Sequence, residues 1–222
     1  MSGLSAILLD LDGTLADTGA DLASSVNAAL EELGFPRHDE ATIRGFIGDG
    51  ARFLMERSLP ASAAHRVDEG LALFRDHYGR NLIRATRLYP GVLETLDALR
   101  PARLAVATNK PEGLSVALLR GLGILDRFTA VVGGDTLPVR KPDPAMLVET
   151  ARRLGVPAAA CVMVGDSPGD IEAGRGAGMA TVAVTFGYRG ADELGAAGPD
   201  AVIDRFPDLV TAFRRLRPLA AR

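Results

Sequence analysis

The sequence contains few of the residues on which several classes of protein depend. Among its 222 residues there is a single cysteine, Cys161, so no disulfide can form within the chain and a reducing compartment is expected. Cysteine and histidine are too few and too scattered to provide a set of zinc ligands. The net charge of −3 leaves no basic surplus, which argues against nucleic-acid binding.

Long apolar runs and a basic N-terminal region are also missing. The first apolar run, residues 6–9, ends at Asp10, so it predicts neither a signal peptide nor a membrane span. Apolar residues still make up 47% of the chain, which is enough for a substantial core. We therefore expect a cytoplasmic protein, monomeric or homodimeric, with no membrane or nucleic-acid partner.

Lysine is rarer than the basic content suggests. The chain has 25 lysines and arginines together, yet only Lys110 and Lys141 are lysines. A compact ammonium and a planar guanidinium fit different sites. The two lysines are therefore either incidental or stand where a compact ammonium is required.

The most informative stretch is residues 6–14, AILLDLDGT. Its apolar run is too short for a helix core and suits a strand buried on both faces. The run ends in Asp10 and Asp12, and Gly13 predicts that the chain turns there. Two carboxylates beside an apolar run are unfavourable unless a cation or an anion-handling task holds them. The alternative is an ordinary solvated Asp-Gly turn.

The remaining sequence divides into two patterns. Residues 15–86 show helical spacing throughout, including one long helix expected over about 65–82. From residue 89 onward, short apolar runs alternate with helical patterns, which predicts parallel strands joined by right-handed crossovers. We expect an α/β fold with a doubly wound, mainly parallel sheet. Residues 1–14 and 87–222 would form the core domain, and residues 15–86 an inserted all-helical cap.

Polar residues follow four of the predicted strands. They are Asp10 and Asp12 after the first, Thr108, Asn109 and Lys110 after the second, Lys141 beyond the third, and Asp166 and Asp170 after the fourth. Parallel strands end at one edge of the sheet, so these groups should meet there. Converging carboxylates favour Mg²⁺. A lysine, a hydroxyl and helix N-termini favour a tetrahedral anion, for which an aspartate is a competent nucleophile.

These segments resemble the four ordered motifs of the haloacid dehalogenase superfamily of phosphohydrolases. The motifs are Asp10-Leu11-Asp12-Gly13-Thr14, the strand end at Thr108, Lys141-Pro142, and Gly165-Asp166 with Asp170, and the helical insertion lies between the first two. Within the superfamily, stretches such as Thr108-Asn109-Lys110-Pro111 and Ile47-Gly48-Asp49-Gly50-Ala51 are most similar to the subgroup of bacterial phosphoglycolate phosphatases. The fold implied is a Rossmann-like core with a helical cap.

The resemblance also implies a role for each matching residue. Asp10 would be the nucleophile and a Mg²⁺ ligand, and Asp12 the acid/base that binds the metal through its backbone carbonyl. Thr108 and Asn109 would hold the phosphoryl group, which Lys141 would pin to the nucleophile. Asp166 would complete the protein ligands of the metal, and Asp170 would orient the site or add a ligand.

The expected reaction is hydrolysis of a small phosphomonoester, 2-phosphoglycolate above all, through an aspartyl-phosphate. Gly50 and Arg52 belong to a glycine-rich stretch that forms either a substrate loop or an ordinary turn between helices. Other substrates, such as a sugar phosphate, remain open, as does a phosphomutase of the same fold. A catalytically silent binding module is disfavoured by the intact set of acids.

Overall fold

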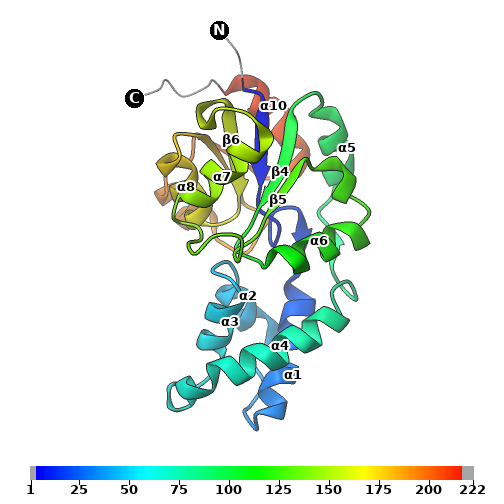
Figure 1. Ribbon diagram of the computed structural model, residues 1–222, viewed down its shortest axis with the longest axis vertical. Helices are drawn as coiled ribbons and strands as arrows, with labels where there is room; N and C mark the ends of the chain where they lie inside the picture. The colour runs from blue at the N-terminus through cyan, green and yellow to red at the C-terminus, as the bar shows by residue number, and fades with distance from the viewer. Residues whose placement is uncertain (1–3, 217–222) are drawn as a thin grey trace.

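A six-stranded parallel sheet forms the centre of the molecule. The structure is a computed structural model that describes residues 4–216, and Figure 1 shows the arrangement of its elements. The sheet order is β5-β4-β1-β6-β7-β8. Its strands are β1 (Ala6–Leu9), β4 (Arg103–Ala107), β5 (Ala130–Val132), β6 (Cys161–Gly165), β7 (Ala180–Val184) and β8 (Ala201–Ile203). The expected doubly wound α/β architecture is confirmed.

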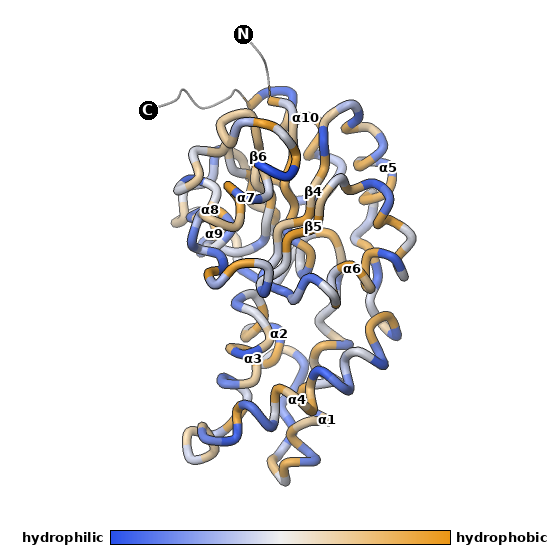
Figure 2. The backbone as a smooth tube through the Cα atoms, viewed as in Figure 1, coloured by the Kyte–Doolittle hydropathy of each residue, from blue (hydrophilic) through white to orange (hydrophobic). Residues whose placement is uncertain are grey.

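Helices cover both faces of this sheet because successive strand side chains point to opposite faces. In β1, Ile7 and Leu9 belong to one hydrophobic cluster, whereas Ala6 and Leu8 belong to another. The first cluster includes side chains of α5 (Val92–Ala98), α6 (Glu112–Gly121) and α10 (Leu209–Arg215). The second includes side chains of α7 (Ala145–Leu154) and α8 (Pro168–Gly176). Figure 2 shows strands β4 and β5 among the strongly hydrophobic segments.

The site-bearing edge is determined by the position of β1 in the sheet. β1 pairs with β4 on one side and β6 on the other, with Leu9 opposite both Val106 and Val164. The chain builds outward from β1 to β5 on one side and from β6 to β8 on the other. Such a reversal of strand order opens a crevice at the carboxyl ends of the strands, where open α/β sheets bind ligands.

Four helices beyond this edge form what we call the helical unit, residues 19–80. It comprises α1 (Gly19–Glu32), α2 (Glu40–Phe46), α3 (Ala51–Ser58) and α4 (Val67–Arg80). Their inward side chains form a hydrophobic cluster separate from those of the sheet. Figure 1 shows the unit below the sheet, beside α6. Its status as an independent domain with boundaries at 14/15 and 86/87 stays a prediction.

The two connections to the helical unit pair with each other. β2 (Ala16–Asp17) and β3 (Arg87–Leu88) form a two-stranded antiparallel sheet that sequence analysis did not predict. Next to it, the buried carboxylate of Asp21 accepts hydrogen bonds from the backbone N–H groups of Ala85 and Thr86 and from the Thr86 hydroxyl. Asp21 therefore ties the incoming and outgoing segments together.

The remaining elements are short. The expected helix over about 65–82 is divided into a 3₁₀ helix (Ala61–Arg66) and α4, and α9 (Ala191–Ala196) was not predicted. Further 3₁₀ turns span Leu125–Arg127, Ala158–Ala160 and Phe206–Asp208. α9 offers little periodicity to detect, since Leu194 is its one buried residue. Within residues 4–216, no helix combines the length and the apolar character that a bilayer-crossing segment requires.

Candidate active site

Asp10 and Lys141 form an ion pair at the carboxyl end of β1. Both side chains are buried, and Lys141 Nζ lies 3.1 Å from Asp10 Oδ1. The ammonium also donates hydrogen bonds to the Ala107 carbonyl at 2.8 Å and to Asp170 Oδ1 at 2.6 Å. The end of β4 and the first turn of α8 thus hold the Lys141 ammonium against Asp10.

Burial dominates the protonation behaviour of this pair. It raises the pKa of Asp10 to about 6, with further increases from Asp170 and Asp12, while Lys141 acts in the opposite direction. Burial lowers the pKa of Lys141, but the carboxylates of Asp10 and Asp170 outweigh it and leave that pKa above its ordinary value. The lysine therefore stays charged, and Asp10 needs additional positive charge to be fully ionised throughout the neutral range.

Asp166 follows β6 and is enclosed by two glycines. A Cβ at Gly13, where φ is +84°, would lie 2.2 Å from Asp166 Oδ2, and one at Gly187 would lie 2.3 Å from Asp166 Cβ. Asp166 accepts hydrogen bonds from the Thr14 hydroxyl (3.2 Å) and from the Tyr188 backbone N–H (2.8 Å). Burial, together with Asp10 and Asp170, raises its pKa to about 8.

The donor set fits a hard divalent cation. Carboxylate oxygens of Asp10, Asp166 and Asp170 lie within 4.8 Å of one another, and all three residues are buried. Asp10 Oδ1 is buried and accepts no hydrogen bond from the described residues, although Lys141 is near. Oxygen donors that repel one another in a buried site are stabilised by such a cation.

Asp170 differs from the other two acids because its oxygens are engaged. Oδ1 accepts from Lys141, and Oδ2 accepts from the Ser167 backbone N–H (3.0 Å) and hydroxyl (2.7 Å) in a capping box at the start of α8. These contacts suit Asp170 to positioning Lys141, which was one of its two expected roles.

The raised carboxylate pKa values predict an unusual pH dependence of stability in metal-free protein. Between the unfolded pKa, near 4, and the folded values of about 6 for Asp10 and about 8 for Asp166, the folded state binds more protons than the unfolded state. These groups therefore stabilise the fold at low pH, and that stability is lost as the pH rises through the folded pKa values. In EDTA, the melting temperature should fall by several degrees from about pH 5.5 to about pH 8.

Thermal unfolding with and without MgCl₂ checks this expectation. Mg²⁺ favours the ionised carboxylates, so the stabilisation by Mg²⁺ should be larger at pH 8 than at pH 5.5. A melting temperature in EDTA that rises from pH 5.5 to pH 8 would contradict the account.

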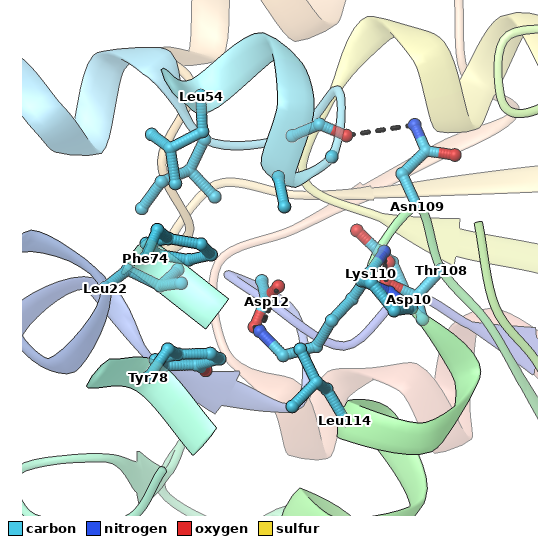
Figure 3. A pocket seen from close by; sticks show the side chains of 15 residues that line it. Asp10, Asp12, Leu22, Leu54, Phe74, Tyr78, Thr108, Asn109, Lys110 and Leu114 are labelled. Carbon is cyan, nitrogen blue, oxygen red and sulfur yellow. Dashed lines mark hydrogen bonds and ion pairs between the residues drawn. The ribbon is translucent and has the colours of Figure 1, made fainter. Parts of the chain in front are cut away.

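Asp12 lies in a different environment from Asp10. Its Oδ1 accepts hydrogen bonds from the Thr18 hydroxyl (2.8 Å) and Lys110 Nζ (3.0 Å), and its Oδ2 lies 2.9 Å from the same ammonium. Figure 3 shows Asp12 meeting Lys110, with Phe74 and Tyr78 of α4 nearby. The Asp12 carboxylate does not belong to the acidic cluster, which leaves only its backbone carbonyl for the metal contact expected from the sequence.

Thr108 and Asn109 follow β4, as predicted. The Thr108 hydroxyl accepts a hydrogen bond from the Lys110 backbone N–H. The Asn109 amide binds both backbone groups of Lys141, accepting from N–H at 3.0 Å and donating to the carbonyl at 3.1 Å, and also donates to the Gly48 carbonyl at 3.0 Å. The side-chain amide of Asn109 therefore links Lys141 to Gly48 of the helical unit.

The two site residues expected from the helical unit are placed differently. Gly50, with φ of +94°, precedes α3 and lines a pocket that also contains Asp10 and Asp12. A Cβ added to Gly50 would lie 3.0 Å from the Asn109 carbonyl oxygen. Arg52 does not line this pocket. Its guanidinium pairs with Asp68 (2.6 Å) and Glu56 (3.0 Å) instead. The structure therefore brings Gly50, but not Arg52, to the pocket that contains Asp10.

The helical unit closes over the site through contacts that sequence analysis missed. Arg189 donates to the carbonyls of Gly45 (2.9 Å) and Ile47 (2.7 Å), and the Tyr188 hydroxyl accepts from the Thr18 backbone N–H (2.8 Å). These partners are more than 140 residues apart in sequence, and no local pattern indicates such pairs. The pocket between the unit and the sheet has a volume of about 30 Å³, room for about two water molecules.

Comparison with known proteins identifies related sequences. Residues 7–184 match the family model described as haloacid dehalogenase-like hydrolase. A protein of Colwellia psychrerythraea named phosphoglycolate phosphatase is 40% identical, covering 94% of this chain and 96% of its own. One of Mesorhizobium japonicum with the same name is 43% identical, covering 91% and 92%.

Solved structures give a consistent picture. The crystal structure of a predicted phosphoglycolate phosphatase from Haemophilus somnus superimposes with a TM-score of 0.89 at 35% identity, covering 94% of this chain and 97% of that one. A protein of Rhodobacter sphaeroides solved with xylulose-1,5-bisphosphate gives a TM-score of 0.78 at 26% identity, covering 93% and 96%.

Proposed function

The chain belongs to the haloacid dehalogenase-like hydrolase family, and we propose that it is a Mg²⁺-dependent phosphatase that hydrolyses 2-phosphoglycolate to glycolate and phosphate. The observation that carries this proposal is the meeting of Asp10, Asp166 and Lys141 at one sheet edge. The names of the relatives from Colwellia and Mesorhizobium support the choice of substrate.

Asp10 is the nucleophile in this proposal. One of its carboxylate oxygens forms a bond to phosphorus while the bond from phosphorus to the glycolate oxygen breaks, which yields an aspartyl-phosphate. Lys141, held at 3.1 Å from Asp10, neutralises negative charge on the transferring group. The Thr108 hydroxyl and the Asn109 backbone N–H donate hydrogen bonds to phosphoryl oxygens.

Asp12 is the general acid and general base in this proposal. It donates a proton to the departing glycolate oxygen and then, as a carboxylate, accepts one from the water that attacks the aspartyl-phosphate. That attack releases phosphate and restores Asp10. Two carboxylates in different environments suit two different roles: Asp10 contacts Lys141 in the buried cluster, whereas Asp12 pairs with Lys110 outside that cluster.

Asp10 and Asp166, with the backbone carbonyl of Asp12, would hold the Mg²⁺, and Asp170 would fix Lys141 from behind. When bound, the ion supplies positive charge beside the phosphoryl oxygens and favours the ionised form of Asp10. The positive charge of the ion would offset the burial and the carboxylate repulsion that raise the pKa values of Asp10 and Asp166.

The helical unit would act as the cap, with Gly50 in the substrate loop. Its closed arrangement excludes water from the phosphoryl group and limits the size of the leaving group. Because the pocket has room for only about two water molecules, entry of any phosphomonoester, 2-phosphoglycolate included, requires the unit to move outward. A sugar phosphate is the second candidate substrate, because the Rhodobacter relative was solved with a sugar bisphosphate.

A panel of phosphomonoesters compared by kcat/KM tests the proposal. We expect 2-phosphoglycolate to exceed sugar phosphates and aryl phosphates by at least about 100-fold, the discrimination expected when a site binds a polar group that the competing substrate lacks. A flat profile, or a preference for sugar phosphates, would reject 2-phosphoglycolate as the substrate. Isomerised product without phosphate release would instead indicate a mutase.

A further inference from the structure

The pocket beside Asp12 contains one cation, and the mechanism above gives it no task. Among the residues that line this pocket, Lys110 is the only lysine or arginine. The Lys110 side chain is buried. Its Nζ atom lies 2.9 Å from Asp12 Oδ2 and 4.5 Å from the centroid of the Tyr78 ring. An ammonium has three N–H donors, and Asp12 occupies two of them. Within the described residues no second carboxylate pairs with Lys110, and its ammonium lies against Tyr78.

Other cations near the pocket are committed elsewhere. Lys141 is held by Asp10 and Asp170. Three arginines of the helical unit form ion pairs outside the pocket: Arg44 with Asp17, Arg52 with Asp68, and Arg57 with Asp49. Arg140 and Arg189, beside Gly50 and Gly48, donate to backbone carbonyls and do not line the pocket, so Lys110 is the cation that an anionic group inside the pocket meets.

The hydroxyl of Tyr78, beside Lys110, is a second indication of a ligand. It lies on α4, its side chain is fully buried, and it lines the same pocket as Lys110. Its hydroxyl makes no hydrogen bond to any residue in the described part of the chain. A buried hydroxyl without a partner costs free energy, and a ligand oxygen would satisfy it.

We propose that Lys110 and Tyr78 form the subsite that binds the carboxylate of 2-phosphoglycolate and selects this substrate over phosphomonoesters that lack a carboxylate. The inference rests on the proposed function. Asp12 protonates the glycolate oxygen, and in glycolate a single methylene separates that oxygen from the carboxylate. A group that contacts Asp12 from the pocket side is therefore positioned next to the carboxylate, and Lys110 is that group.

The surroundings strengthen this pairing. Leu54 of α3, Phe74 of α4 and Leu114 of α6 line the pocket around Lys110 (Figure 3). Apolar walls lower the local dielectric, so an ion pair there is stronger than one in water, and an unmatched neutral group is rejected more firmly. The subsite thus joins the helical unit, through Tyr78, to the core, through Lys110.

The test compares two substrates that differ only at the carboxylate. We expect wild-type enzyme to favour 2-phosphoglycolate over 2-hydroxyethyl phosphate, and we measure the ratio of their kcat/KM values. Lys110→Met should lower this ratio about 100-fold, because it removes a buried charge partner. Tyr78→Phe, which removes one hydroxyl and keeps the ring, should lower it about tenfold.

The ratio separates binding of the carboxylate from other effects. Loss of Lys110 also disturbs Asp12, which slows both substrates, but a purely structural role leaves the ratio unchanged. Arg80→Met is the matched control, since Arg80 is an exposed cation on the same helix as Tyr78 and pairs with Asp76. It should retain the wild-type ratio.

A binding measurement tests the carboxylate subsite without catalytic turnover. By calorimetry with Mg²⁺, wild-type protein should bind 3-phosphonopropionate at least about 100-fold more tightly than propylphosphonate, and Lys110→Met should lose that difference. A wild-type enzyme without preference for the carboxylate would overturn the proposed function and this subsite with it. A wild-type preference that both variants keep would overturn the subsite alone.

Discussion

Replacement of Asp10 by asparagine is expected to abolish phosphatase activity, with kcat for 2-phosphoglycolate reduced by at least about 10⁴-fold. An amide is too weak a nucleophile to attack phosphorus, yet it has nearly the same shape as the carboxylate. Asp10 and Asp170 are the two acids that contact Lys141 directly, and of these two only Asp10 follows the central strand β1. A steady-state assay with saturating Mg²⁺ measures the loss.

The Asp10→Asn variant should remain folded, which makes its inactivity informative. Burial disfavours the charged form of Asp10 and raises its pKa to about 6, so a neutral side chain there is not expected to destabilise metal-free protein at pH 8. Asp126→Asn is the matched control, because the Asp126 side chain is 83% exposed and does not line the pocket. Persistent turnover in Asp10→Asn would remove Asp10 as the nucleophile.

Removal of Mg²⁺ is the second large effect. Treatment with EDTA should reduce kcat/KM by at least about 10³-fold, and added Mg²⁺ should restore it. The reason is the acidic cluster: Asp10, Asp166 and Asp170 repel one another in a buried site, and Lys141 neutralises only part of that charge. Without a cation, the incoming phosphate adds further negative charge.

Asp166→Asn separates a specific metal site from a general salt effect. The variant should lose activity, and Mg²⁺ should no longer raise its melting temperature, whereas wild-type protein should gain several degrees. Asp143→Asn serves as the control, since Asp143 lies in an exposed loop and accepts a hydrogen bond from the Ala145 backbone N–H. Full activity in EDTA, or equal stabilisation of Asp166→Asn by Mg²⁺, would contradict a Mg²⁺ site at Asp166.

The sequence predicted the sheet and its polar edge because the physics involved is local or topological. An apolar run followed by Asp10 marks a buried strand end, and parallel strands bring their carboxyl ends to one edge. The position of Asp166 beside Asp10 follows from that rule, whereas Lys141 lies nine residues beyond the end of β5 and reaches the edge through the intervening loop. Helical periodicity likewise predicted α1 and α4, apart from the 3₁₀ turn before α4.

Features that depend on side-chain direction or on distant partners could not be predicted. β2 and β3 have two residues each, too few for any periodicity. Arg52 lies close in sequence to Gly50, yet its guanidinium pairs with Asp68 of α4, a partner 16 residues away that local sequence does not indicate. Lys110 stood out by composition, but its contact with Asp12 and Tyr78 depends on how α4 packs against the sheet edge.

The central claim is that Asp10 accepts the phosphoryl group, and chemical trapping of the intermediate tests it most directly. Enzyme quenched during turnover of 2-phosphoglycolate with Mg²⁺ is reduced with borohydride, which converts an aspartyl-phosphate to homoserine, and its peptides are analysed by mass spectrometry. We predict homoserine at position 10, absent without substrate and absent in Asp10→Asn. Homoserine at position 12 or 166 would contradict the account, as would an unmodified Asp10 in enzyme whose intermediate is shown by burst kinetics to accumulate.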